Sequence, residues 1–136
     1  MSVGPYASVR PGCKIEDSAR IGTFVEVTRS QIGEGSDVLH ACYLGDAQLG
    51  EHVSVGAGSI TVNFDGVHKH RTHIGDHVFL GSNTVLIAPV EIESGVRSPQ
   101  NAVLSGAVKK MGSPTLQEIP QEPIASALPT PQKGKK

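Results

Sequence analysis

Aliphatic residues recur every six positions along most of this chain, and that spacing restricts its fold more than any other feature. They form sets of three that start 17 residues apart, followed by a set of four: Ile15, Ile21 and Val27; Ile32, Val38 and Leu44; Leu49, Val55 and Thr61; Ile74, Leu80, Leu86 and Ile92. Val3 and Val9 extend the rhythm toward the N-terminus. An α-helix cannot use this period, because six residues advance it by about 1.7 turns and scatter the anchors around its surface.

A triangular tube of short parallel strands does suit a six-residue period. Each coil contains three strands and each strand uses one hexad, so that the anchors stack above one another inside the tube. Glycine often follows an anchor directly, which suits corners where a positive φ or a close approach of two backbones excludes a side chain. The sequence therefore predicts an all-β fold, a parallel β-helix of hexapeptide repeats with about five coils.

Two segments interrupt the repeat and predict the domain organisation. Residues 62–73 do not fit the hexads and are expected to leave the tube as a protruding loop, where binding residues are often found. Ser98 stands where an aliphatic anchor is due, so the β-helix domain is expected to span residues 1–97. Residues 98–136 are expected to form an irregular, Pro-rich C-terminal tail.

Composition excludes several classes of protein. The formal net charge is −1 and the body of the chain has no basic cluster, which argues against binding to nucleic acid. Two cysteines are too few for a disulfide scaffold, and no membrane-spanning or signal-like segment is evident, so a cytoplasmic protein is expected. The anchors bury too little apolar surface to offset the ordering of the chain, so an outer face is expected to be buried in a homotrimer.

Several segments together resemble one enzyme family: GPYASVRPG (4–12), IGTFVEV (21–27), LHACYLGD (39–46), VGAGSITVNFDGVHKH (55–70) and IGDHVFLGSNTVLIAPV (74–90). This family is the C-terminal acetyltransferase domain of bacterial bifunctional glucosamine-1-phosphate N-acetyltransferase and N-acetylglucosamine-1-phosphate uridylyltransferase. The resemblance implies a left-handed β-helix and acetyl-CoA as co-substrate. It also implies N-acetylation of glucosamine 1-phosphate, or a similar amino sugar phosphate, in UDP-N-acetylglucosamine and cell-wall biosynthesis. Uridylyl transfer is not expected, since this sequence has no nucleotidyltransferase segment.

The resemblance also implies site residues. His40 corresponds to the general base that takes a proton from the attacking amine, a task that suits a side chain with an ordinary pKa of about 6.5. Glu26 corresponds to a glutamate that orients this base. Six further residues correspond to ligand contacts: Arg10 and Lys69 with the sugar phosphate, Tyr43 and Asn63 with the sugar, and Ser82 and Ala57 with acetyl-CoA.

Three positions depart from the family pattern. Thr28 stands where a basic residue is usual, with Arg29 beside it as a displaced substitute. Ser54 replaces an asparagine. Residues 98–101 replace the small-residue hexad of a further coil that helps to hold coenzyme A.

Other interpretations of the same residues remain open. A catalytically inactive, trimeric β-helix could serve as a scaffold or as a sugar-phosphate-binding module, with the tail available to a partner. Three histidines of the predicted loop could instead form a metal site like the three-histidine site of carbonic anhydrases: His68, His70 and His73. They lie within six residues of one loop, however, so no metal is expected. Asp65 is expected to shape a turn, and Cys42 to fill space inside the coil.

Overall fold

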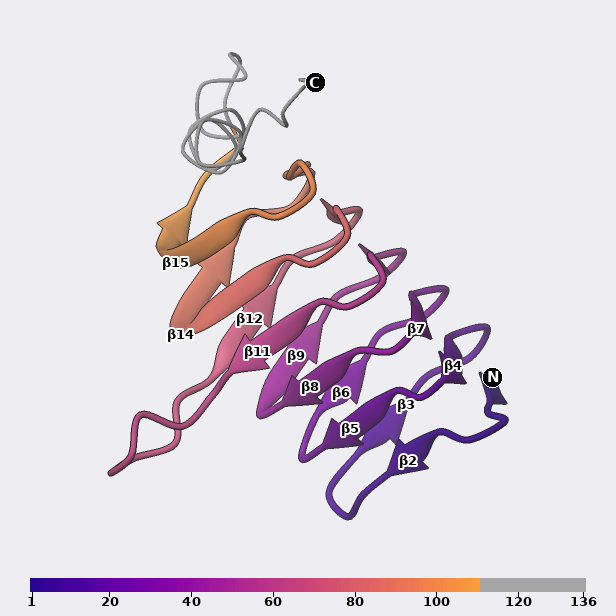
Figure 1. Ribbon diagram of the computed structural model, residues 1–136. Helices are drawn as coiled ribbons and strands as arrows, with labels where there is room; N and C mark the ends of the chain where they lie inside the picture. The colour runs from indigo at the N-terminus through magenta and orange to yellow at the C-terminus, as the bar shows by residue number, and fades with distance from the viewer. Residues whose placement is uncertain (111–136) are drawn as a thin grey trace, which may run out of the picture.

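The computed structural model describes residues 1–110, which fold as a stack of about six triangular coils without a helix (Figure 1). The predicted left-handed parallel β-helix is confirmed. The coils outnumber the five or so that were expected, because residues beyond position 97 continue the stack. One loop, between β11 (Ile60–Val62) and β12 (Thr72–Ile74), projects away from the coils, as predicted.

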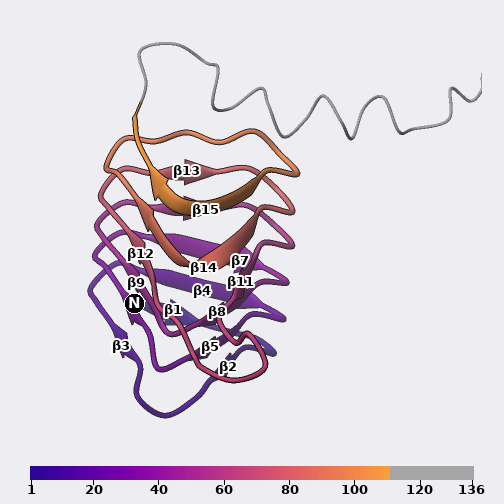
Figure 2. The ribbon, with the colours of Figure 1, turned by 90° about the vertical axis from the view of Figure 1, so that its left-hand side faces the viewer.

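The strands of successive coils stack into three faces. The first face is a parallel sheet of five strands: β1 (Ser2–Val3), β4 (Arg20–Thr23), β7 (Asp37–His40), β10 (Ser54–Val55) and β13 (Phe79–Leu80). The second face, seen in Figure 2, stacks β11 with five others: β2 (Ser8–Val9), β5 (Glu26–Thr28), β8 (Tyr43–Gly45), β14 (Val85–Ile92) and β15 (Val103–Val108). The third face stacks β12 with β3 (Lys14–Ile15), β6 (Gln31–Ile32) and β9 (Ala47–Leu49), and β14 and β15 wrap round onto it.

The anchors of the hexads fill the inside of the tube, as their spacing predicts. Val27 pairs in register with Leu44, and Ile32 with Leu49, so that one aliphatic side chain lies above the next. The anchors of the middle coils are almost fully buried. Val3 is 47% exposed because no described strand covers β1 on its outer side. The hydrophobic core is therefore a continuous column along the helix axis.

The corners use positive φ in a way that the sequence did not predict. Within residues 1–110, ten residues other than glycine have a positive φ, among them Phe24, Arg29 and Asp46. Apart from Gly4, the glycines that follow anchors do not have a positive φ. They are needed for close backbone approach instead, because a Cβ on Gly33 would overlap the carbonyl oxygen of Gly50 in the next coil.

The predicted domain boundary at residue 97 is wrong. Ser98 is buried in an anchor position, where its Oγ accepts a hydrogen bond from the Gly81 N–H at 3.2 Å and lies 3.5 Å from Thr84 Oγ1. A small hydroxyl group can therefore occupy an inward position if a backbone donor and a second hydroxyl group satisfy it. The chain then forms β15, which pairs with β14 along both faces. The predicted irregular tail lies outside the described residues from position 111 onward.

Candidate functional site

His40, Ala57 and Ser82 lie one above another along the corner between the first and second faces. The chain turns there at positive-φ residues, and each turn donates a backbone hydrogen bond to the coil before it. The Gly58 N–H donates to the His40 carbonyl oxygen at 3.2 Å, and the Asn83 N–H donates to the Ala57 carbonyl oxygen at 2.8 Å. The structure thus brings the predicted base and both predicted acetyl-CoA residues to one edge of the prism, on three successive coils.

The His40 side chain is exposed at this corner. Within residues 1–110 its imidazole makes no hydrogen bond or ion pair, so both ring nitrogens are available to a ligand. Cys42, two residues further on, points inward, and its thiol donates to the carbonyl oxygens of His40 and Gly56 at 3.1 and 3.3 Å. Burial raises the pKa of the Cys42 thiol, which fits a space-filling role and not a nucleophile.

Glu26 and Tyr43 are register partners on the second face, adjacent to this corner. Glu26 Oε2 lies 3.9 Å from Arg10 Nη1, and both side chains are about half exposed. Glu26 makes no hydrogen bond to His40 within the described single chain, although the resemblance implied that it orients this histidine. The register partner of His40 is Thr23, whereas Glu26 pairs with Tyr43, three residues further along the chain.

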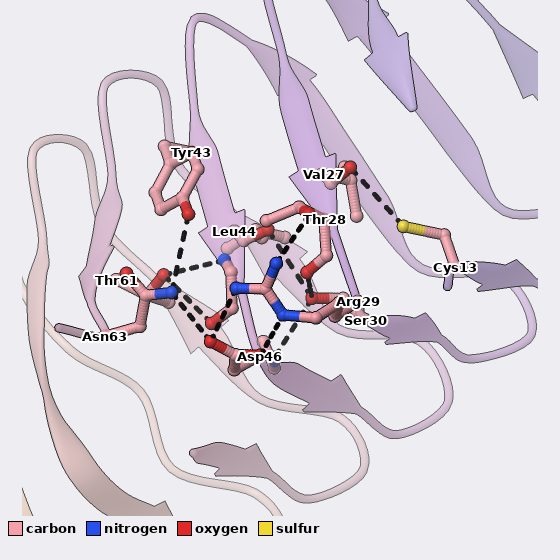
Figure 3. A network of polar contacts seen from close by, with 12 residues as sticks. Cys13, Val27, Thr28, Arg29, Ser30, Tyr43, Leu44, Asp46, Thr61 and Asn63 are labelled. Carbon is pink, nitrogen blue, oxygen red and sulfur yellow. Dashed lines mark hydrogen bonds and ion pairs between the residues drawn. The ribbon is translucent and has the colours of Figure 1, made fainter. Parts of the chain in front are cut away.

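The carboxylate of Asp46 is the centre of a polar network at the opposite edge of the second face (Figure 3). Arg29 donates to it twice, from Nε at 2.7 Å and from Nη2 at 3.0 Å. Asn63 Nδ2 donates to Asp46 Oδ2 at 2.8 Å, and also to the Tyr43 hydroxyl oxygen at 3.4 Å. Two of the predicted sugar contacts, Tyr43 and Asn63, are therefore joined to each other and to a part-buried ion pair, in which Asp46 is buried and Arg29 is exposed.

Arg29 does not act as a free substitute for the basic residue that Thr28 replaces. Its guanidinium is held by Asp46 and also lies 3.4 Å from Thr28 Oγ1. The hydrogen bond from Arg29 is the main cause that holds the pKa of Asp46 below its ordinary value, and the hydrogen bond from Asn63 and the charge of Lys69 act in the same direction. The pair is therefore ionised at neutral pH, and its two charges offset each other.

The loop that follows β11 is ordered by the side chain of Asp65. Its Oδ1 accepts the backbone N–H groups of Val67 and His68 at 2.8 and 2.7 Å, and its Oδ2 lies 2.8 Å from His70 Nε2. These bonds hold the pKa of Asp65 well below its ordinary value. Asp65 thus makes the turn that the sequence predicts, and an antiparallel bridge between Phe64 and Lys69 closes the two arms of the loop.

The three loop histidines do not converge. His70 contacts Asp65, His68 is exposed near the tip, and His73 lies on β12 between Gln48 and Glu91 on the third face. The described part of the chain contains no group of three histidine, cysteine, aspartate or glutamate side chains that could hold a metal ion. Two shallow grooves of about 340 and 450 Å³ run beside His73, on a different face from His40.

Comparison with known proteins addresses the resemblance directly. No family model matches the chain. It is 56% identical over 96 residues to the bifunctional protein GlmU of Prochlorococcus marinus (strain MIT 9313), a match that covers 71% of this chain and 22% of that protein. The resemblance to GlmU proteins is confirmed. The GlmU of Roseobacter denitrificans (strain ATCC 33942 / OCh 114) is 57% identical over 89 residues, which cover 65% of this chain and 20% of that GlmU. The chain thus spans about a fifth of the length of these two GlmU proteins.

Solved structures share the fold at low sequence identity. The H141N mutant of perosamine N-acetyltransferase from Caulobacter crescentus, in complex with CoA and GDP-perosamine, superposes with a TM-score of 0.69 at 19% identity. This match covers 79% of this chain and 49% of that one. The acetyltransferase domain of PglB from Neisseria gonorrhoeae FA1090, in complex with acetyl coenzyme A, gives a TM-score of 0.71 at 21% identity, over 79% and 50% of the two chains. Residues 1–110 contain no helix with the length and hydropathy needed to cross a bilayer.

Proposed function

We propose that this chain is an N-acetyltransferase that transfers the acetyl group of acetyl-CoA to the amine of glucosamine 1-phosphate or a similar amino sugar phosphate. The observation that carries the proposal is the corner at which His40, Ala57 and Ser82 stack on successive coils. This corner borders the face that presents Tyr43 and Asn63. The similarity to GlmU proteins supports this reaction, as do the ligands of the solved structures that share the fold.

The transfer needs one base and no covalent acyl-enzyme. The unprotonated amine of the sugar attacks the thioester carbonyl carbon, forming a C–N bond and a tetrahedral intermediate. His40 accepts the proton that the nitrogen loses and returns it to the sulfur as the C–S bond breaks, so that coenzyme A leaves as its thiol and the base is regenerated. The exposed imidazole of His40 is free to accept this proton because no side chain of residues 1–110 occupies either ring nitrogen.

The other predicted site residues hold the two substrates. Arg10 and Lys69 supply positive charge for the sugar phosphate, and both side chains are exposed on the second face and its loop. Tyr43 and Asn63 contact the sugar, while Ala57 and Ser82 contact acetyl-CoA along the corner. Glu26 is assigned to orient the imidazole of His40, although in the single chain its Oε2 lies 3.9 Å from Arg10 Nη1.

A homotrimer would complete this site in a cytoplasmic enzyme. Apolar side chains point outward from the upper strands of the second face and are between 37% and 52% exposed: Ile60, Val62, Ile87 and Val103. The loop adds Phe64 and Val67, which are also exposed. Packing this face against a second copy would bury these side chains and would cover the otherwise open surface beside Tyr43.

A scaffold without catalytic activity is the second candidate. It is favoured by the Arg29–Asp46 pair, which leaves the site without a free basic side chain in place of the one that the family usually has at position 28. Such a protein would bind an amino sugar phosphate or a partner without turning over acetyl-CoA.

A substrate panel separates the two candidates. Release of free thiol from acetyl-CoA is followed with glucosamine 1-phosphate, with other amino sugar phosphates and with amino sugars that lack a phosphate. The proposal predicts turnover that requires an amino sugar and is fastest with a phosphorylated one. Binding of a sugar phosphate by calorimetry, without thiol release for any acceptor, would establish the scaffold instead.

A further inference from the structure

Asp46 is a buried carboxylate to which the proposed reaction gives no part. Its residue is 7% exposed, and its two oxygens accept three hydrogen bonds, two from Arg29 and one from Asn63. The backbone also holds it in place, since the Asp46 N–H donates to the Thr28 carbonyl oxygen and the Asp46 carbonyl oxygen accepts from the Thr72 N–H. The backbone of Asp46 is therefore held on both sides of its Cα, and its carboxylate in turn holds the side chain of Asn63 in place.

The carboxylate determines which end of the Asn63 amide points inward. An ionised carboxylate can only accept hydrogen bonds, so the amide must turn its NH₂ group toward Asp46. The amide oxygen could not take that place, because two acceptors would then face each other at hydrogen-bond distance. One N–H of Asn63 is thereby directed to Asp46 Oδ2, and the NH₂ group also reaches the Tyr43 hydroxyl oxygen.

This orientation gives Tyr43 and Asn63 opposite hydrogen-bonding roles toward a ligand. The Tyr43 hydroxyl accepts from Asn63, and its own hydrogen has no acceptor within residues 1–110. The Asn63 Oδ1 has no donor within residues 1–110 either. Among these residues, the one fully buried side-chain polar atom without a partner is Thr72 Oγ1, so Asn63 Oδ1 is not fully buried. A donor and an acceptor are thus open side by side.

We propose that Asp46 is a positioning residue that sets this donor–acceptor pair for a ligand group able both to accept and to donate a hydrogen bond. A sugar hydroxyl group and the amide of the pantetheine arm of acetyl-CoA share this chemistry, whereas a fully ionised phosphate cannot donate. The proposal rests on the proposed function, because it assigns the pair to one of the two substrates of that reaction. Arg29 completes the arrangement by offsetting the charge of the carboxylate.

Kinetics of Asp46→Asn test the proposal, with Asp37→Asn as a matched control. Asp37 also accepts two hydrogen bonds from an arginine of the preceding coil, Arg20, at 2.8 Å each, but contacts no asparagine or tyrosine. An amide at position 46 can turn either end toward Asn63, so the orientation of the pair is lost. We expect the KM for one substrate to rise about tenfold with kcat changed less than threefold, while Asp37→Asn stays within twofold of the wild type.

A double substitution shows whether Asp46 acts through Asn63. If it does, Asp46→Asn combined with Asn63→Ala raises KM no further than Asn63→Ala alone. A rise confined to the KM of the amino sugar assigns the pair to a sugar hydroxyl group, and a rise confined to the KM of acetyl-CoA assigns it to the pantetheine amide. Unchanged KM values for both substrates, or effects that multiply in the double variant, would overturn the proposal.

The orientation itself can be measured without turnover, which separates this proposal from the proposed function. In the full chain, the side-chain NH₂ signals of Asn63 in a ¹⁵N-correlated NMR spectrum report its hydrogen bonds. Slow exchange of these protons with solvent is expected in the wild type and in Asp37→Asn, and fast exchange in Asp46→Asn. Equal exchange in all three proteins would refute the positioning role, whether or not the enzyme is active. An inactive wild type with the expected exchange pattern would instead refute only the reaction.

Discussion

The guanidinium of Arg29 donates two hydrogen bonds to the carboxylate of Asp46, from Nε at 2.7 Å and from Nη2 at 3.0 Å. The two residues lie on successive coils at the same corner, and both have a positive φ. A two-point contact of this kind is stronger than a single exposed ion pair, because the planar donors match the two carboxylate oxygens. It links the corner below the loop to Asn63, the first residue after β11.

The stability of the chain should depend on pH through Asp46. The pKa of Asp46 is lower in the folded chain than in the unfolded chain. The carboxylate therefore contributes fully to the free energy of unfolding above the ordinary aspartate pKa of about 4, and this contribution is lost as the pH falls through the lower pKa of the folded chain. We expect the thermal midpoint of the wild type to fall between pH 5 and pH 3, and that of Asp46→Asn to fall less. An equal loss in both proteins over that interval would contradict this role.

The order of the loop should depend on the Asp65 carboxylate. Because its pKa is also lowered, the carboxylate keeps its backbone hydrogen bonds at neutral pH and loses them only when the pH falls well below the ordinary aspartate pKa of about 4. In Asp65→Ala, amide exchange at Val67 and His68 is expected to become at least tenfold faster at pH 7. Amides of the buried strand β12 serve as the internal control and should be unaffected. Continued protection of Val67 and His68 would show that other contacts hold the loop.

The buried hydroxyl group of Ser98 should contribute to stability. Ser98→Ala leaves the Gly81 N–H without its acceptor inside the last coil, which should cost roughly 1–2 kcal/mol of unfolding free energy. Ser105→Ala, on the exposed side of β15, is the matched control and should change stability by less than about 0.5 kcal/mol. Chemical denaturation measures both. Equal effects would mean that Ser98 is not an anchor of a sixth coil.

The proposed trimer should depend on the outward apolar side chains of the second face. Ile87 is 40% exposed on β14, and Ile87→Glu would place a charge in the proposed contact without disturbing the core. Analytical ultracentrifugation is expected to show a trimer for the wild type and a monomer for Ile87→Glu. Ala107→Glu, on the third face, should remain trimeric. A monomeric wild type would exclude this assembly.

The fold could be predicted because its pattern is local. The six-residue spacing of the anchors and the 17-residue spacing of the coils are both present in the sequence, and the anchors from Ile21 to Ile92 are buried inside the tube as expected. The end of the domain was predicted wrongly at Ser98, because a single polar residue was read as the end of the pattern. Its partners, Gly81 and Thr84, belong to the preceding coil and could not be seen from the residues around position 98.

The sequence predicts a set of candidate site residues, whose roles stay predictions, but it does not predict the network that joins them. Arg29 was expected to be a displaced substitute for the basic residue that Thr28 replaces, because its neighbourhood in sequence does not reveal Asp46. The spacing of the two residues offered a signal that was missed: they lie 17 positions apart, the same separation as Arg20 and Asp37, which also form a two-point pair. Oppositely charged residues one coil apart are therefore worth seeking in any sequence with this repeat.

The most direct test of the account is the steady-state rate of acetyl transfer by His40→Ala, measured beside His52→Ala. His52 is also exposed at a corner, where its ring stacks on His77 with centroids 5.3 Å apart, and it lies on a different edge of the prism. If His40 is the general base, kcat falls at least a hundredfold in His40→Ala and less than twofold in His52→Ala, with both proteins folded and assembled as the wild type. Wild-type turnover by His40→Ala would contradict the assignment of the base.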